Sequence, residues 1–212
     1  MSKAGSIAAG TIADADVEAG QRAAEHRDHP VVKVAGQASE IADQPPLVAL
    51  SAATVTLGLV LRRPAILRVG LRMLAAHALA TGVKSVVKAN IDRTRPARAE
   101  AVGHHVGSGA GTQDGGLNSF PSGHTAGAVA VTEAIVRDIP GAALPARAAA
   151  IAVAGIQVPR GKHYVSDLMA GAAIGWASEV AVNAGLRIAE RALGAARAQW
   201  RGTERPAPPA QP

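Results

Sequence analysis

A four-residue segment in the middle of the chain has side chains suited to holding an anion. It reads Pro121-Ser122-Gly123-His124. Serine caps a helix through its hydroxyl, and glycine lets the backbone approach a ligand closely. The free N–H groups of a first helical turn favour an anion, and His124 would stand beside it as a proton donor. The segment therefore predicts a phosphate-binding site with His124 next to it as a proton donor.

A basic pair precedes this segment. Lys88 and Arg95 are seven residues apart, about two helical turns, so they can share a face and converge on one anion. The planar fork of arginine matches a phosphate, whereas lysine acts as a point charge. The alternative is a basic cluster at the end of an apolar helix, formed together with Arg93 and Arg98.

A histidine and a carboxylate follow, four residues apart. The Asp167 carboxylate can reach one imidazole nitrogen of His163, fix its tautomer and leave the other nitrogen free to attack. The alternative is a helix cap beside a surface histidine, because Ser166-Asp167 is also a good helix start.

Composition limits the classes of partner. The 212 residues carry a formal net charge of +6, include no cysteine, and are 48% hydrophobic but only 2% aromatic. Cysteine-based zinc and iron–sulfur sites are excluded. Nucleic acid is not expected as a partner, because the chain has too few aromatic side chains to stack on bases. The basic charge fits an anionic substrate or an anionic membrane surface.

Five apolar segments, without a lasting strand pattern, predict an all-α fold with about five core helices. They lie at 46–61, 64–90, 122–137, 145–158 and 166–187. Residues 1–45 are expected to form a polar N-terminal tail, 46–187 a helical domain, and 188–212 a basic, Pro-rich C-terminal tail.

The helices have mixed membrane character. Several are shorter than the roughly 20 residues of a full span, and charges interrupt them. Residues 46–61 and 164–178 nevertheless contain no Lys, Arg or Glu, and Gly171 and Gly175 form a G-x-x-x-G face that suits close packing in lipid. We predict a membrane-embedded bundle; the alternative is a soluble bundle of Ala-rich helices. In a membrane, the Arg-rich side would be cytoplasmic and the motifs would face outward, toward the periplasm in a bacterial-type cell.

Taken together, the three motifs run Lys-x6-Arg-Pro, Pro-Ser-Gly-His and His-x3-Asp along the chain. This order resembles the type 2 phosphatidic acid phosphatase family, in the superfamily that also holds vanadium haloperoxidases and bacterial acid phosphatases. The resemblance covers about residues 46–187, and its specificity is concentrated in the motifs.

The resemblance implies a role for each matching position. His163 would be the nucleophile that forms a phosphohistidine, Asp167 would orient and charge-stabilise it, and His124 would protonate the leaving alkoxide and later activate water. The groups that would hold the phosphoryl oxygens are Lys88, Arg95, Ser122 and the Gly123 backbone N–H. The family needs no metal, and the motifs hold no acidic cluster of the kind that Mg²⁺ prefers, so no metal or other cofactor is expected. The adjacent His104 and His105 fit a solvated loop or lid better than a metal site.

Two departures from the family stand out. Its third motif begins Ser-Arg, but this chain has Ile156 and Gln157 there. Gln157 can still donate a hydrogen bond to phosphate, but a charged hydrogen bond worth about 1.5–3 kcal/mol is lost, which predicts weaker binding or slower turnover. Arg160 is a candidate substitute if the local helix turns it inward. Membrane members also usually have six core helices, against the five expected here.

The leading hypothesis is a metal-independent membrane phosphatase that removes a terminal phosphate from a lipid through a phosphohistidine. Candidate substrates are phosphatidic acid, phosphatidylglycerol phosphate and a polyprenyl pyrophosphate. Alternatives are a soluble or peripheral acid phosphatase on small phosphomonoesters, a haloperoxidase-like use of the pocket with vanadate, and a non-catalytic membrane protein that binds lipid phosphate.

Overall fold

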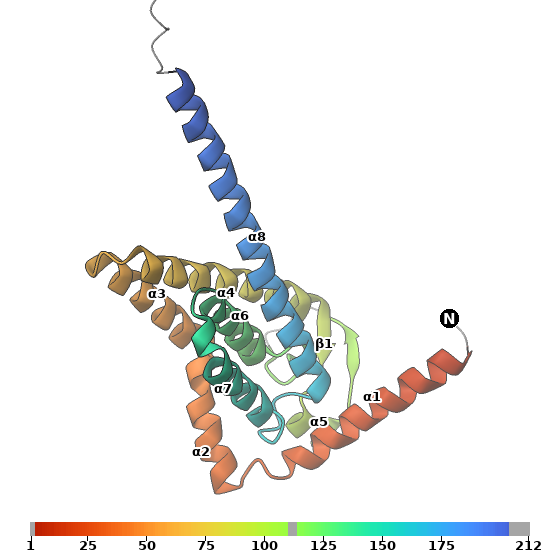
Figure 1. The fold of residues 1–212 in the computed structure, drawn as a ribbon. Coiled ribbons are helices and arrows are strands. Elements are labelled where there is room, and N and C mark those ends of the chain that lie inside the picture. Colours follow the sequence, from red (N-terminus) through yellow and green to blue (C-terminus); the bar gives the residue numbers. More distant parts are fainter. Residues whose placement is uncertain (1–2, 110–113, 204–212) are drawn as a thin grey trace, which may run out of the picture.

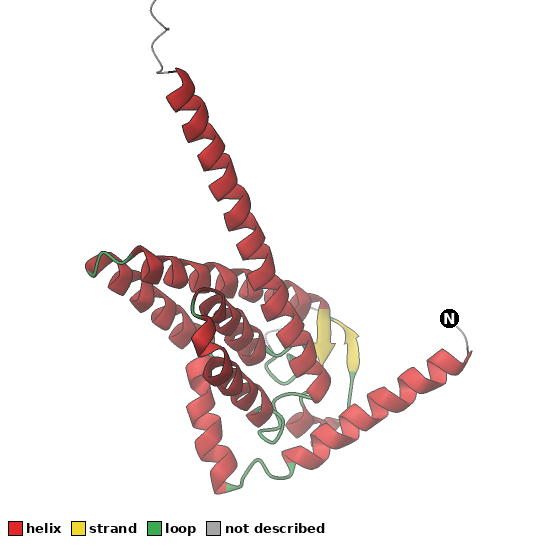
Figure 2. Ribbon diagram, in the orientation of Figure 1, coloured by secondary structure: helices red, strands yellow, loops and turns green. Residues whose placement is uncertain are grey.

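A computed structural model describes residues 3–109 and 114–203 as a bundle of helices (Figure 1). The predicted all-α fold is confirmed, and the two three-residue strands form a small ribbon at one end of the bundle (Figure 2). In chain order the elements are α1 (Lys3–Ala24), α2 (Pro30–Ser39), η1 (Glu40–Ala42), α3 (Gln44–Val60), α4 (Pro64–Asn90), β1 (Ile91–Arg93), α5 (Pro96–Val102), β2 (Val106–Ser108), α6 (Gly123–Asp138), η2 (Pro140–Ala142), α7 (Ala143–Ile156) and α8 (Val165–Thr203).

The five expected core helices correspond to α3, α4, α6, α7 and α8. Helix α6 packs against α4, α7 and α8, and α3 packs along α4. The core between them is built largely of alanine, with Val69, Met73 and Val131 among its larger members. Small side chains let helices approach closely.

The predicted G-x-x-x-G face of α8 lies directly against α6. A Cβ atom at Gly171 would come within 2.5 Å of the Ser122 carbonyl oxygen, and one at Gly175 within 2.4 Å of the Ala126 carbonyl oxygen. Any larger residue would push the two helices apart. This contact therefore sets the start of α6 beside the start of α8, where two of the motifs lie.

Helix α8 is longer than the expected fifth core helix. It continues to Thr203, into the segment expected as a basic tail, and stands clear of the bundle (Figure 1). Alanine and arginine, both strong helix formers, dominate residues 188–203, and the next proline is Pro206.

The segment expected as a polar tail contains two helices and contacts the domain. Helix α1 runs across the end of the bundle beside α5 (Figure 1), and it also touches α8. Helix α2 packs against α7. The alternation of acidic and basic residues that made this segment look solvated instead supplies ion pairs to the bundle, such as Arg27 with Glu100.

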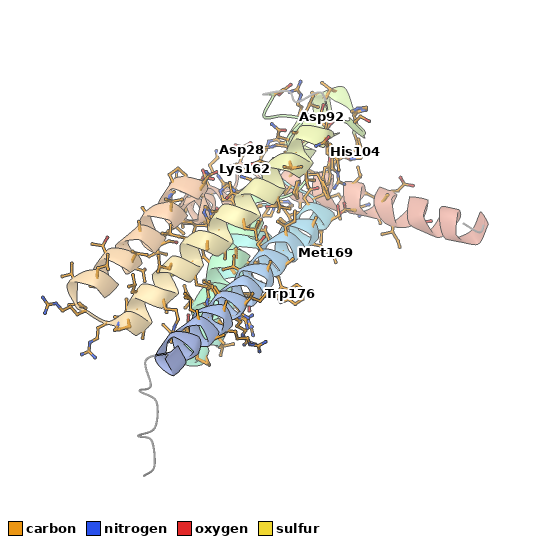
Figure 3. All side chains as sticks on the ribbon, turned by 90° about the horizontal axis from the view of Figure 1, so that it is seen from above. Asp28, Asp92, His104, Lys162, Met169 and Trp176 are labelled. Carbon is orange, nitrogen blue, oxygen red and sulfur yellow. The ribbon has the colours of Figure 1, made fainter. Side chains whose placement is uncertain are left out.

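Large apolar side chains are exposed on the outside of the core helices. They include Leu57, Leu79, Ile151, Met169 and Trp176. Figure 3 shows Met169 near the start of α8 and Trp176 farther along it, away from the end that carries His104 and Lys162. Within the described residues, α4 is the one helix long and apolar enough to cross a membrane, and α3 and residues 140–156 are shorter apolar helices.

Candidate active site

The three sequence motifs meet at one end of the bundle. The first motif begins in the last turn of α4, the second opens α6, and the third runs from the loop before α8 into its first turn. A backbone hydrogen bond from the Ser122 N–H to the Asp167 carbonyl oxygen, 3.1 Å long, joins the second motif to the third.

His163 is buried at the centre of this end, with 3% of its surface exposed. Its Nδ1 atom lies 2.7 Å from the Ser119 carbonyl oxygen. A carbonyl oxygen only accepts, so Nδ1 carries the proton and donates it. The Nε2 atom is then left with a free lone pair, which is the form of imidazole that can attack an electrophile.

The Asp167 carboxylate lies behind the imidazole. Its Oδ2 atom is 3.6 Å from His163 Nδ1 and accepts hydrogen bonds from the Ser119 hydroxyl at 2.6 Å and the Tyr164 N–H at 2.9 Å. Its Oδ1 atom accepts from Arg93 at 2.6 Å. The tautomer is therefore set first by the Ser119 carbonyl, and Asp167 contributes a fixed negative charge rather than the hydrogen bond that the spacing predicted.

Burial keeps the imidazole neutral. Loss of solvent lowers the pKa of His163 to about 4, and the positive charges of Arg95 and Lys88 act in the same direction against the opposing effect of Asp167. Because this pKa lies well below neutrality, Nε2 is unprotonated at pH 7 and available as a nucleophile.

Two cations of the first motif stand near His163 and pair with no carboxylate in the part of the chain that the structure describes. Lys88 Nζ donates to the Asn118 carbonyl oxygen at 2.5 Å. Arg95 is largely buried, and its Nε atom finds no hydrogen-bond acceptor among the residues that the structure describes. Burial lowers the pKa of Arg95, a sign that its charge is poorly compensated. An anion placed between Lys88 and Arg95 would satisfy both.

The start of α6 offers backbone donors to the same space. Ser122 is the N-cap, and its hydroxyl accepts the Thr125 N–H at 3.4 Å. Since the Ser122 N–H is used by Asp167, the donors left in the first turn are the N–H groups of Gly123 and His124. The His124 ring is mostly buried, and its Nε2 atom lies 3.4 Å from the Glu40 carboxylate.

Comparison with known proteins places this arrangement in a family. Residues 69–187, more than half of the chain, match the family model of the PAP2 superfamily. The chain belongs to the PAP2 superfamily. The expected kinship with the type 2 phosphatidic acid phosphatases is thereby confirmed.

A solved structure supports the fold. It is described as the first transmembrane PAP2 type phosphatidylglycerolphosphate phosphatase from Bacillus subtilis. The similarity has a TM-score of 0.61 and 22% sequence identity, and covers 84% of this chain and 87% of that one. At this identity the similarity shows a shared fold. No curated protein matches the chain.

The position where PAP2 proteins carry the third-motif arginine is occupied by a fully engaged side chain. Gln157 is completely buried, and its Nε2 atom donates to the Ser39 hydroxyl and to the Val153 carbonyl oxygen, both at 3.0 Å. Its Oε1 atom accepts from Arg160 at 3.3 Å. Gln157 therefore links α7 to the N-terminal segment, and neither of its N–H groups is directed to a ligand in this arrangement.

Arg160, the candidate substitute, is also held by the N-terminal segment. It donates to the Ser39 hydroxyl at 2.9 Å and to the Glu40 carboxylate, which Lys162 also contacts at 3.1 Å. Burial alone would raise the pKa of Glu40, but hydrogen bonds from Arg160 and Lys162 outweigh it and lower that pKa to about 2. Arg160 thus stands at the edge of the site with its charge neutralised.

Several side chains at this end were not predicted as site residues. Lys84 is one helical turn before Lys88, so the helical spacing used for Lys88 would also have found it. Arg93 was named only in the alternative basic cluster, because residues two positions apart do not share a helix face. The Lys84 side chain lies against the start of α6, where its Cδ atom would be 3.2 Å from a Cβ atom at Gly123. Ser119, Asp16 and Glu40 lack any local signal, because each reaches the site from a distant or irregular segment.

One group in the described part of the chain has a spacing compatible with a metal ion. The possible ligand atoms of Glu40, Asp43 and His124 lie within 4.8 Å of one another. The Glu40 carboxylate, however, already accepts from Arg160 and Lys162. Because Arg160 and Lys162 already neutralise Glu40, the group fits an ion-pair cluster better than a metal site.

Proposed function

We propose that this protein is a metal-independent phosphatase that hydrolyses a terminal phosphate of a membrane lipid through a phosphohistidine. One observation carries the proposal: a buried imidazole, with Nδ1 committed to a carbonyl, leaves Nε2 free beside two cations that have no carboxylate partner among the described residues. A loose phosphoryl transition state needs positioned positive charge and an in-line nucleophile more than any other help.

In the first step, His163 Nε2 attacks phosphorus. The P–N bond forms as the bond from phosphorus to the leaving alkoxide breaks, and His124 gives its proton to that alkoxide. The attacked imidazole becomes cationic, since Nδ1 keeps its hydrogen. The negative charge of Asp167, 3.6 Å from Nδ1, and the Ser119 carbonyl both stabilise this cation.

In the second step, His124 takes a proton from water, which attacks phosphorus from the side that the alkoxide left. The P–N bond breaks, and neutral His163 and inorganic phosphate are released. Lys88, Arg95 and the N–H groups of Gly123 and His124 would hold the phosphoryl oxygens in both steps.

The apolar outside of the bundle supports a lipid substrate. Exposed leucine, isoleucine, methionine and tryptophan side chains on several core helices form the kind of surface that marks a membrane or a partner. The solved structure of similar fold is named for phosphatidylglycerolphosphate, which is one of the three candidate lipids, with phosphatidic acid and a polyprenyl pyrophosphate. In a bacterial-type membrane the site would face the periplasm.

A second candidate is a soluble or peripheral acid phosphatase that uses the same site on small phosphomonoesters. It is favoured by the finding that α4 is the single helix in the described residues long and apolar enough for a span. Cell fractionation distinguishes the two: an integral lipid phosphatase needs detergent to leave the membrane fraction, whereas a soluble enzyme does not.

The test of the proposal is phosphate release by the detergent-purified full chain. Each candidate lipid is offered in mixed micelles with EDTA present, and vanadate is added as an inhibitor. His163→Ala is expected to lower the rate at least about 10³-fold, because it removes the nucleophile. His26→Ala, which changes an exposed histidine, is the matched control and should keep wild-type activity. Equal inactivity of wild type and His163→Ala on all three lipids and on p-nitrophenyl phosphate would reject a catalytic role and leave lipid-phosphate binding.

A further inference from the structure

Helix α1 brings a carboxylate into contact with the catalytic loop. Asp16 lies outside residues 69–187, the part that matches the family. Its Oδ2 atom is 2.9 Å from an Arg93 guanidinium nitrogen and accepts the Ser166 hydroxyl at 2.5 Å. Its Oδ1 atom accepts the Ser166 backbone N–H at 3.1 Å. Both carboxylate oxygens are thus used, and the Asp16 side chain is only 13% exposed.

Arg93 connects this carboxylate to the catalytic one. One terminal nitrogen of Arg93 binds Asp16, and the other binds Asp167 Oδ1 at 2.6 Å. The guanidinium is planar and rigid, so a shift at one nitrogen moves the other. The face of the same guanidinium lies 4.1 Å from the centre of the Tyr164 ring. Asp16 therefore fixes the orientation of the Arg93 guanidinium, which binds Asp167.

The contact with Ser166 acts on the same carboxylate by a second route. Helix α8 begins at Val165, so the Ser166 N–H belongs to the first turn and has no carbonyl partner within the helix. Asp16 accepts this hydrogen bond, as an N-cap carboxylate would, although it comes from another helix. Asp167 is the next residue, so the hydrogen bond from the Ser166 N–H to Asp16 also fixes the backbone at Asp167.

The fit of α1 against the loop is close. A Cβ atom at Gly20 would lie 2.4 Å from a ring carbon of Tyr164, the residue after His163. The absence of a side chain at this position lets α1 approach near enough for Asp16 to reach Arg93. Burial alone would raise the pKa of Asp16, but hydrogen bonds from Ser166 and Arg93 outweigh it and hold that pKa below its usual range, so the carboxylate is ionised at neutral pH.

We propose that Asp16 is a positioning residue of the active site, which acts through Arg93 and Ser166 to hold Asp167 behind the His163 imidazole. This inference rests on the proposed phosphohistidine mechanism, because the position of Asp167 matters most when the imidazole becomes cationic. Without Asp16, Arg93 can turn fully onto Asp167 and draw it away from Nδ1. The effect belongs to the transition state, so it should appear in kcat and not in KM.

The experiment compares Asp16→Asn with Asp14→Asn in the detergent-purified full chain. Asp14 is exposed on the same helix, so its replacement makes the same chemical change away from Arg93. The readouts are vanadate affinity by titration calorimetry, kcat and KM on p-nitrophenyl phosphate, and the thermal midpoint. Asp16→Asn is expected to lower kcat and vanadate affinity roughly 10- to 100-fold while KM stays within about twofold. Asp14→Asn should match wild type.

A double-mutant cycle separates positioning from simple stabilisation. If Asp16 acts through Arg93, the loss in Asp16→Asn/Arg93→Gln is smaller than the product of the single losses. Single losses that multiply, or an Asp16→Asn variant whose kcat and vanadate affinity equal those of Asp14→Asn, would overturn the inference while the proposed function stands. A wild-type chain that binds no vanadate and releases no phosphate would overturn both.

Discussion

The two ends of the bundle differ in whether their enclosed charges are paired. At the end away from the site, Glu179 is completely buried and accepts two hydrogen bonds from Arg137, each 2.5 Å long. At the site end, Arg95 and Lys88 are partly buried and lack a carboxylate partner among the described residues. Along α8, Glu179 lies 12 residues after the site residue Asp167, roughly 18 Å away.

The difference separates paired charges, which hold helices together, from unpaired cations, which are suited to binding an anionic ligand. A paired charge joins α6 to α8, and removing one partner leaves the other uncompensated. An unpaired buried cation has the opposite effect, since it disfavours the folded state until an anion arrives. Substitutions at the two ends should therefore have opposite consequences for activity and stability.

The largest effect is expected from Arg95→Ala. Loss of this cation should lower kcat/KM by about 10²- to 10³-fold, the range seen when one transition-state donor is removed. The thermal midpoint should stay the same or rise, because no described carboxylate pairs with this cation. Arg98→Ala is the matched control: Arg98 forms an exposed ion pair with Asp114, and its replacement should change little. A clear fall in the midpoint with retained kcat/KM would show that Arg95 is structural and break the comparison.

At the other end, Glu179→Gln should affect stability and spare chemistry. It leaves Arg137 without its buried partner, which is expected to cost about 3 kcal/mol of unfolding free energy in a denaturant titration. Activity per folded molecule should stay at the wild-type level. Glu133→Gln is the control, because its partner Arg147 is half exposed, and a change within about 1 kcal/mol is expected. A large loss of kcat in folded Glu179→Gln would mean that the far end is coupled to the site.

The smallest effect concerns pH. With a His163 pKa of about 4, the nucleophile is roughly 90% neutral at pH 5, so kcat/KM should fall less than about twofold from pH 7 to pH 5. An ordinary pKa of about 6.5 would give a loss of about 25-fold. The measurement uses His124→Asn, in which the second imidazole of the site no longer titrates. An acid limb near pH 6.5 in this variant would contradict a buried, cation-flanked nucleophile.

The same shift has a stability consequence of known sign. In the unfolded chain His163 protonates near its ordinary pKa, whereas in the folded chain it stays neutral down to about pH 4. Between these values the unfolded state binds more protons. This residue therefore makes the folded state less stable as pH falls from about 6.5 to 4.

The sequence was sufficient for the core helices and the motif residues because both are local patterns. Apolar periodicity and proline boundaries predicted α3 and α4 closely, and the His163–Asp167 spacing placed that pair at the start of α8. The extension of α8 beyond residue 187 was missed because its charged surface resembles a solvated tail. In fact, arginine and glutamate suit an exposed helix.

The docking of the N-terminal helices was not predictable in the same way. The hydrogen bond from Ser166 to Asp16 joins residues 150 positions apart, and no periodicity or motif spacing reports a contact at that range. The fixing of the His163 tautomer by a backbone carbonyl was also hidden, since every residue has such a group and only the path of the chain brings the one at Ser119 to Nδ1. Residue types predicted which side chains do chemistry, and tertiary structure alone revealed what holds them.

The exposed indole of Trp176, on the outer face of α8, gives the protein an intrinsic optical probe. The chain has two tryptophans, Trp176 and Trp200, so Trp200→Phe leaves one emitter on the bundle. An indole immersed in acyl chains emits at shorter wavelength than one in water, and bromine atoms attached at a chosen depth along the lipid quench it on contact. Steady-state fluorescence in brominated vesicles thus tests whether α8 enters a bilayer and, if it does, how deep Trp176 lies, without any label being added.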